Sequence, residues 1–172
     1  QSMIKKLTQK QKLKKLNRLA RNIIKTNQYV SIATSQKPSA KPWISPVAYT
    51  FDDKWNLYFI SIPTSRHCRY ARKNSQVAAA IFDSQQKWGL GVGLQIEGTI
   101  NIVPIKDTLK ISKLYFGRKC PYGKVTSAMV KGLKNMLTGK NRLYRFYKIT
   151  PKIFFINDPY SKIDKRVRVN LH

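Results

Sequence analysis

The chain has 172 residues, of which 42% are hydrophobic, enough for one domain with a single core. Lys and Arg number 34 against seven Asp and Glu, which gives a formal net charge of +27. Such an excess attracts polyanions, for example nucleic acid or an anionic membrane. The few acidic residues argue against hydrolytic chemistry, and the sequence contains no recognisable metal-ligand cluster.

The sequence also bounds the expected cellular setting. No apolar run approaches the roughly 18 residues that a membrane span needs, and the basic N-terminus lacks the apolar core of a signal peptide. Cys68 and Cys120 are too few for a disulfide framework. We therefore expect a cytoplasmic protein. Gln1-Ser2 reads as the remnant of a cleaved tag, which leaves residues 3–172 as the expected domain.

The first predicted element is an amphipathic helix over residues 4–26. Its leucines and isoleucines recur at spacings of three and four, while Lys and Arg occupy the other face. Asn27 is expected to end it. Such a helix either packs on its own domain or binds acidic lipid through its basic face.

The rest of the chain is mainly β. Alternating or continuous apolar runs predict strands at residues 29–34, 43–51, 57–62, 77–82, 94–103 and 143–156, the last interrupted by Pro151, with a short edge strand at 167–171. Helical patterns cover about 105–116 and 122–137. Antiparallel strands joined by short hairpins, with a helical insertion before the last long strand, predict an α+β fold: a six-stranded antiparallel Greek-key barrel with flanking helices.

The segment from Tyr58 to Phe82 carries the strongest functional signal. Ser65, Arg66 and His67 place a hydroxyl, a guanidinium and an imidazole on consecutive residues, just after a buried strand and at the start of a helical turn. Backbone N–H groups point outward at a helix start, where the helix dipole favours an anion. The pattern therefore predicts a phosphate site; a solvated basic loop between two strands is the alternative.

The same segment resembles the flavin-phosphate segment of the pyridoxamine 5'-phosphate oxidase-like FMN-binding split barrels. Further stretches resemble strands of that family in the same order: YVSIAT at 29–34, PWISPVAY at 42–49, LQIEGTI at 94–100 and FYKITP at 146–151. The resemblance implies a split barrel, FMN as cofactor, a homodimer with the cofactor between subunits, and a flavin-dependent oxidoreductase.

The resemblance also implies site residues. Ser65, Arg66 and His67 would bind the FMN phosphate, Ile60 and Ser61 would contact the ring or ribityl chain, and Trp43, Ser45, Val47 and Gln95 would line the ring. Tyr115, Arg118 and Lys119 are weaker candidates for binding a substrate phosphate. Trp43 and Val47 fit a barrel core equally well. No catalytic residue is assigned, because the chemistry of such a site belongs to the flavin.

Two departures from the family argue against a true pyridoxamine phosphate oxidase. The strand at 43–49 lacks the Arg and Lys that those enzymes carry there, and the C-terminal substrate motif is missing. The alternative function is a basic protein that binds nucleic acid or another anionic surface on a β-barrel scaffold. Since Lys outnumbers Arg and no nucleic-acid-binding motif is present, we favour a solvated basic surface, with any nucleic-acid binding non-specific.

Overall fold

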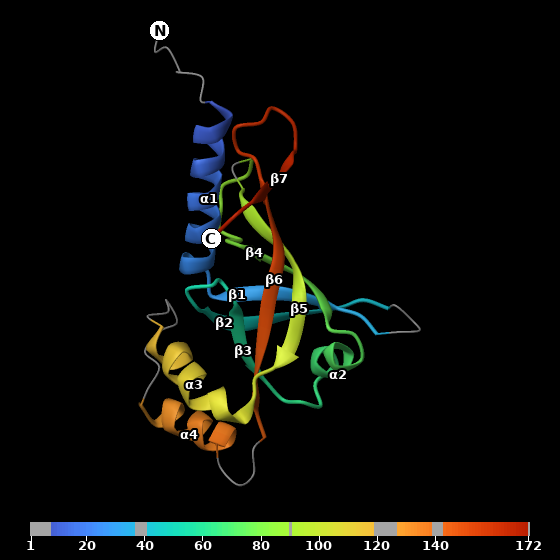
Figure 1. The fold of residues 1–172 in the computed structure, drawn as a ribbon, viewed down its shortest axis with the longest axis vertical. Helices are drawn as coiled ribbons and strands as arrows, with labels where there is room; N and C mark the ends of the chain where they lie inside the picture. Colours follow the sequence, from blue (N-terminus) through green and yellow to red (C-terminus); the bar gives the residue numbers. More distant parts are fainter. Residues whose placement is uncertain (1–7, 37–40, 90, 119–126, 139–142, 172) are drawn as a thin grey trace.

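The structure is a computed structural model that describes residues 8–36, 41–89, 91–118, 127–138 and 143–171. Six antiparallel strands form its centre: β1 (Tyr29–Thr34), β2 (Trp43–Phe51), β3 (Leu57–Ser61), β4 (Gln76–Phe82), β5 (Gly93–Ile102) and β6 (Arg145–Asn157). Their order is β3-β2-β1-β4-β5-β6, and β3 also pairs with β6, so the sheet closes into a barrel (Figure 1). This confirms the predicted six-stranded Greek-key split barrel. A seventh strand, β7 (Arg166–Val169), extends β6 outside the closed barrel.

Alternation along the strands builds the core. On β1, Val30 and Ile32 are fully buried and point into the barrel, while Ser31 and Ala33 face outward. The partner positions on the neighbouring strands follow the same alternation, because residues directly opposite one another share a face. One face of each strand therefore fills the barrel, and the other is left to helices or solvent.

Helix α1 (Gln9–Thr26) packs along one side of the barrel (Figure 1). Thr8 and Gln11 form a reciprocal capping box at its start, which pairs two backbone donors that a helix N-terminus leaves unsatisfied. Asn27 ends the helix, as predicted, and its amide donates to the carbonyl of Ile23. Residues 4–7 of the predicted helix lie outside the described residues.

The remaining helices lie near one end of the barrel (Figure 1). Helix α2 (Arg66–Lys73) follows β3, while a 3₁₀ turn (Ile105–Asp107), α3 (Thr108–Gly117) and α4 (Ser127–Thr138) separate β5 from β6. A second apolar cluster joins α3 and α4 to the outside of β3 and β6: Tyr58, Val103, Ile111, Leu137 and Phe146. The predicted helical insertion is therefore present; its expected residues 122–126 are outside the described part.

The predicted interruption at Pro151 is wrong. Strand β6 runs unbroken from Arg145 to Asn157. A register shift accommodates the proline: Glu97 pairs with Ile153 and Gly98 with Pro151, so Lys152 of β6 has no partner on β5. Gly98 is needed there, since a Cβ atom would clash with the carbonyl oxygen of Thr150. The extra, bulged residue is Lys152 of β6, next to Pro151, and this bulge lets a proline occupy a long central strand.

A search of the described helices for a membrane span gives a negative result: each is too short or too polar to cross a bilayer.

Candidate functional site

The predicted phosphate-binding residues gather where four pieces of chain meet. These are the first residues of β2, the last residue of β3, the turn at 62–65 and the first turn of α2. The turn is closed by a hydrogen bond from the Ser65 amide to the carbonyl of Ile62. Helix α2 then begins at Arg66, which fixes the directions of the two residues that follow Ser65.

A compact cluster of two hydroxyls and an imidazole forms the centre of this site. The Nε2 atom of His67 lies 2.8 Å from the Ser61 Oγ and 3.2 Å from the Ser65 Oγ, and the two hydroxyl oxygens are 3.2 Å apart. Ser61 is buried at the end of β3, whereas Ser65 and His67 are partly exposed. Ser65 occupies the N-cap position of α2, but its side chain does not cap the helix. Its hydroxyl is instead directed into the cluster.

Burial tunes the imidazole of this cluster. The partial burial of His67 lowers its pKa below the ordinary value of 6.5, because an apolar setting disfavours the charged ring. The ring packs near Phe59 of the barrel core, with 6.0 Å between ring centroids. In the free protein the neutral imidazole is therefore favoured, with Nε2 available to a serine hydroxyl.

A cation is held beside the cluster by an aromatic ring. The guanidinium carbon of Arg66 lies 4.0 Å from the centroid of the Trp43 ring, well within the range of a cation–π contact. The indole N–H of Trp43 in turn donates to the Ser45 Oγ at 3.0 Å. Strand β2 therefore presents a fixed aromatic surface on which Arg66 rests, and Arg66 itself stays exposed to solvent.

Two further arginines brace the turn that carries Ser65. Arg69 donates to the carbonyl of Thr64 at 3.3 Å, and Arg72 donates to the carbonyl of Pro63 at 2.9 Å. This bracing role was not predicted from the sequence. Arg69 and Arg72 lie on the helix that follows the turn, five and nine residues after the carbonyls that they contact. A basic helical turn usually indicates solvent-exposed charge, so their spacing alone did not predict these contacts.

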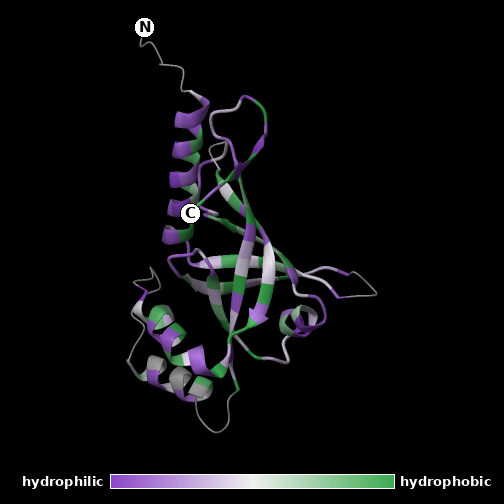
Figure 2. Ribbon diagram, viewed as in Figure 1, coloured by the Kyte–Doolittle hydropathy of each residue, from purple (hydrophilic) through white to green (hydrophobic). Residues whose placement is uncertain are grey.

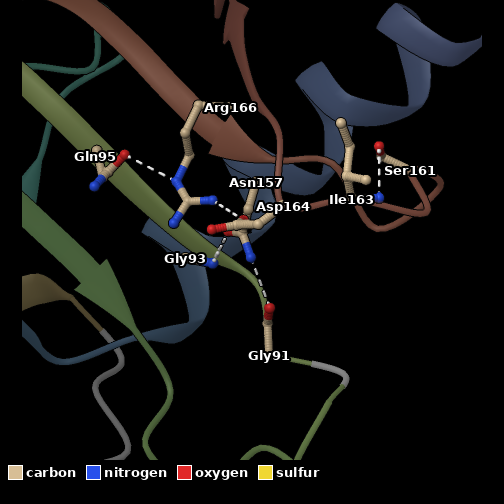
Figure 3. A network of polar contacts seen from close by, with 8 residues as sticks. All are labelled: Gly91, Gly93, Gln95, Asn157, Ser161, Ile163, Asp164 and Arg166. Atoms are coloured by element: carbon tan, nitrogen blue, oxygen red, sulfur yellow. Dashed lines mark hydrogen bonds and ion pairs between the residues drawn. The ribbon is translucent and has the colours of Figure 1, made fainter.

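The other residues proposed for the ring are more dispersed. Val47 packs against the main core two residues along from Ser45. Ile60 is adjacent to Ser61 but points to the opposite side, where it packs on the cluster beneath α3 and α4. Gln95 lies on the outer face of β5, where its side-chain oxygen accepts a hydrogen bond from Arg166 at 3.2 Å (Figure 3). The structure does not bring Ile60 or Gln95 to the hydroxyl–imidazole cluster.

The three weaker candidates have different surroundings. The Tyr115 ring packs edge-on against Phe116 and Phe146. The Arg118 guanidinium donates to the carbonyls of Ile24, Lys25, Asn27 and Tyr49 and lies over the Tyr49 ring. Arg118 therefore ties the C-terminus of α1 to β2, where a cation complements the helix dipole. Lys119 lies outside the described residues.

No protein-family model matches the chain, and a search of curated proteins also finds no match. Solved structures do match. A protein of unknown function from Agrobacterium tumefaciens superimposes with a TM-score of 0.66 at 17% identity, over 89% of this chain and 60% of that one. A heme binding protein from Mycobacterium smegmatis gives 0.66 at 12%, over 89% and 57%. A FAD-binding protein from Mesorhizobium loti gives 0.58 at 17%, over 80% and 91%.

The chain spans 60% and 57% of the length of the first two of these proteins. At such low sequence identities the matches establish the architecture, while function depends on the individual site. The described chain therefore shares its barrel fold with proteins that include a heme-binding and a FAD-binding example.

Proposed function

We propose that this protein binds FMN, with its phosphate on the cluster formed by Ser61, Ser65, Arg66 and His67. The observation that carries the proposal is the convergence of two hydroxyls and an imidazole within 3.2 Å of one another, beside a guanidinium resting on Trp43. The FAD-binding relative and the sequence resemblance support a flavin as the ligand.

The cluster fits a phosphate in the number and kind of its donors. Ser61 and Ser65 each offer an O–H, His67 offers an N–H, and Arg66 offers several N–H groups with a permanent charge. The first turn of α2 adds backbone amides as donors, because the Ser65 side chain does not cap them. An anion bound there would take the place of the internal contacts that the serines and His67 make with one another.

Other residues near the cluster suit the rest of the cofactor. Trp43 is 38% exposed and offers an aromatic surface, and Ser45 holds its indole N–H. Ile60 and Gln95 would contact the same cofactor only if a second subunit or a different pose brought them to it. When bound, a flavin supplies one- or two-electron redox chemistry, and the protein's part is to hold and orient it. We accordingly place the protein among flavin-dependent oxidoreductases that are not pyridoxamine phosphate oxidases.

A homodimer is part of the proposal, and the outer face of the barrel supports it. On the outward side of β1, β2 and β4 several residues are small or apolar: Ser31, Ala33, Ile44, Ala78, Ala80 and Phe82. The polar residues Gln76, Gln95 and Glu97 border them. Ile44 is 65% exposed and Phe82 54% exposed. A face with these exposed apolar side chains is suited to burial against a second copy.

Absorbance spectroscopy tests the cofactor assignment. The purified protein is mixed with FMN, passed through a desalting column and scanned for the flavin band at about 450 nm, a property of the flavin itself. Retention of about one FMN per chain, with weaker retention of riboflavin, supports the proposal. Equal retention of FMN and riboflavin would refute the phosphate site. If the protein retains added heme but no flavin, heme would be the ligand in place of FMN. Sedimentation in the presence of FMN tests whether the protein is a dimer.

A further inference from the structure

Helix α1 has two chemically different faces, and the flavin proposal uses neither. Leu16, Ala20, Ile23 and Ile24 are buried against the barrel. The side that faces away from the barrel is hydrophilic along the length of the helix (Figure 2). The buried residues recur at spacings of three and four, so the two faces follow from the helical period itself.

The outward face carries a straight line of cations, here called the α1 basic stripe: Lys10, Lys14, Arg18, Arg21 and Lys25. Successive members are four, four, three and four residues apart, which places them one above another on a single side of the helix. At 1.5 Å per residue the stripe is about 22 Å long. Four of its members are exposed and Arg21 is partly exposed.

Acidic partners are missing from this stripe. Every charged residue of α1 is Lys or Arg, and the helix's one recorded ion pair joins Lys12, outside the stripe, to Asp158. In the described part of the chain no carboxylate lies at ion-pair distance from a stripe residue. Like charges at these spacings destabilise a helix by about 0.2–0.5 kcal/mol per pair. A polyanion bound along the helix would relieve that repulsion.

The geometry of α1 favours a nucleic acid over a lipid bilayer. A basic amphipathic helix binds a membrane by burying its apolar face among the lipids. In α1 that face is already packed on the barrel, and Leu16 and Ile24 are at most 1% exposed. Leu13, near the start of the helix, is 42% exposed, and the rest of the available surface is mainly charged or polar. Duplex nucleic acid carries about one charge per 1.7 Å of its axis, and its major groove is about as wide as an α-helix.

We propose that the α1 basic stripe binds the phosphate backbone of duplex nucleic acid, without sequence preference. The five cations contact phosphates, and the helix lies along a groove or across one strand. The stripe consists of lysines and arginines on a single line, and contacts from such side chains to phosphates carry no sequence information. The interaction is independent of the flavin site.

The test uses the full-length protein and a fluorescent 20-base-pair DNA duplex, with binding followed by anisotropy between 0.05 and 0.3 M salt. The variant K10Q/K14Q/R18Q removes three exposed cations that form no ion pair within the described residues. Its control, K106Q/K110Q/K113Q, removes three exposed cations at the start of the helical insertion. Thermal melts of both variants check folding, and vesicles of phosphatidylserine provide the membrane arm.

Each lost phosphate contact changes the slope of log K against log salt by about 0.9. We expect the slope of the α1 variant to be less negative by about 2.7, with duplex affinity reduced on the order of a hundredfold at 0.1 M salt. The control should keep most of the wild-type slope, and a duplex of scrambled sequence should bind equally well. Equal losses in both variants would overturn the proposal, because the charge would then act diffusely. Absence of duplex binding, or binding to vesicles alone, would also overturn it.

Discussion

Replacing Arg66 with Ala should weaken FMN binding while leaving riboflavin binding unchanged. A hydrogen bond to a charged group contributes about 1.5–3 kcal/mol. In the free protein Arg66 lies 4.0 Å from the Trp43 ring, and an exposed cation–π contact contributes about 0.5–1 kcal/mol. If the phosphate draws the guanidinium off the ring, the two terms oppose each other. The expected net loss is about 1–2 kcal/mol, or roughly five- to thirtyfold in Kd.

Isothermal titration with FMN and riboflavin measures this effect. Lys73→Ala is the matched control, since Lys73 is an exposed cation in the last turn of the same helix. Arg72 is unsuitable as a control because it donates to the carbonyl of Pro63 and so braces the turn before α2. Equal losses for FMN and riboflavin, or equal effects of the Arg66 and Lys73 substitutions, would refute the reasoning.

Three further outcomes are expected. Because burial lowers the pKa of His67 and a nearby phosphate favours the charged ring, FMN affinity should rise as the pH falls from 8 towards 6.5, and His67→Gln should abolish that rise in a titration series. Arg118→Ala should lower the free energy of unfolding by about 2 kcal/mol, because four carbonyls lose a charged donor; a loss of FMN affinity without loss of stability would instead support a role in binding. Gly98→Ala should destabilise the barrel by about 2 kcal/mol or more in denaturant titrations, since its Cβ would meet the Thr150 carbonyl. The control Gly93→Ala should cost little, because a Cβ there makes ordinary contacts. Equal losses of stability in the two variants would argue against the tight packing at the bulge.

The strands could be predicted from the sequence because their signals are local. The predicted segments at 29–34 and 43–51 coincide with β1 and β2, and the others differ from the structure by one or two residues at their ends. Pro151 misled the prediction, since its cost depends on how β6 pairs with β5: a bulge at Lys152 sets Pro151 opposite Gly98, which lies more than fifty residues earlier. A proline can be interpreted only together with its partner strand.

The site shows the same division between local and long-range information. Ser65, Arg66 and His67 are consecutive, and a helix start holds them together. The position of Ser61 could also be predicted, because it is the last residue of the strand that leads into the turn. In contrast, the contact between Trp43 and Arg66 joins strand β2 to helix α2, so no local periodicity in the sequence could reveal it. Ile60 was placed beside Ser61 by adjacency, but neighbouring residues on a strand face opposite sides.

A crystal structure of the protein with FMN would show whether the hydroxyl–imidazole cluster holds the FMN phosphate. We expect phosphate oxygens within about 3.2 Å of the Ser65 hydroxyl and the His67 Nε2 atom, with the Arg66 guanidinium turned towards them. A phosphate bound elsewhere, with the contact of 2.8 Å between Ser61 and His67 intact, would show that the cluster is not the phosphate site.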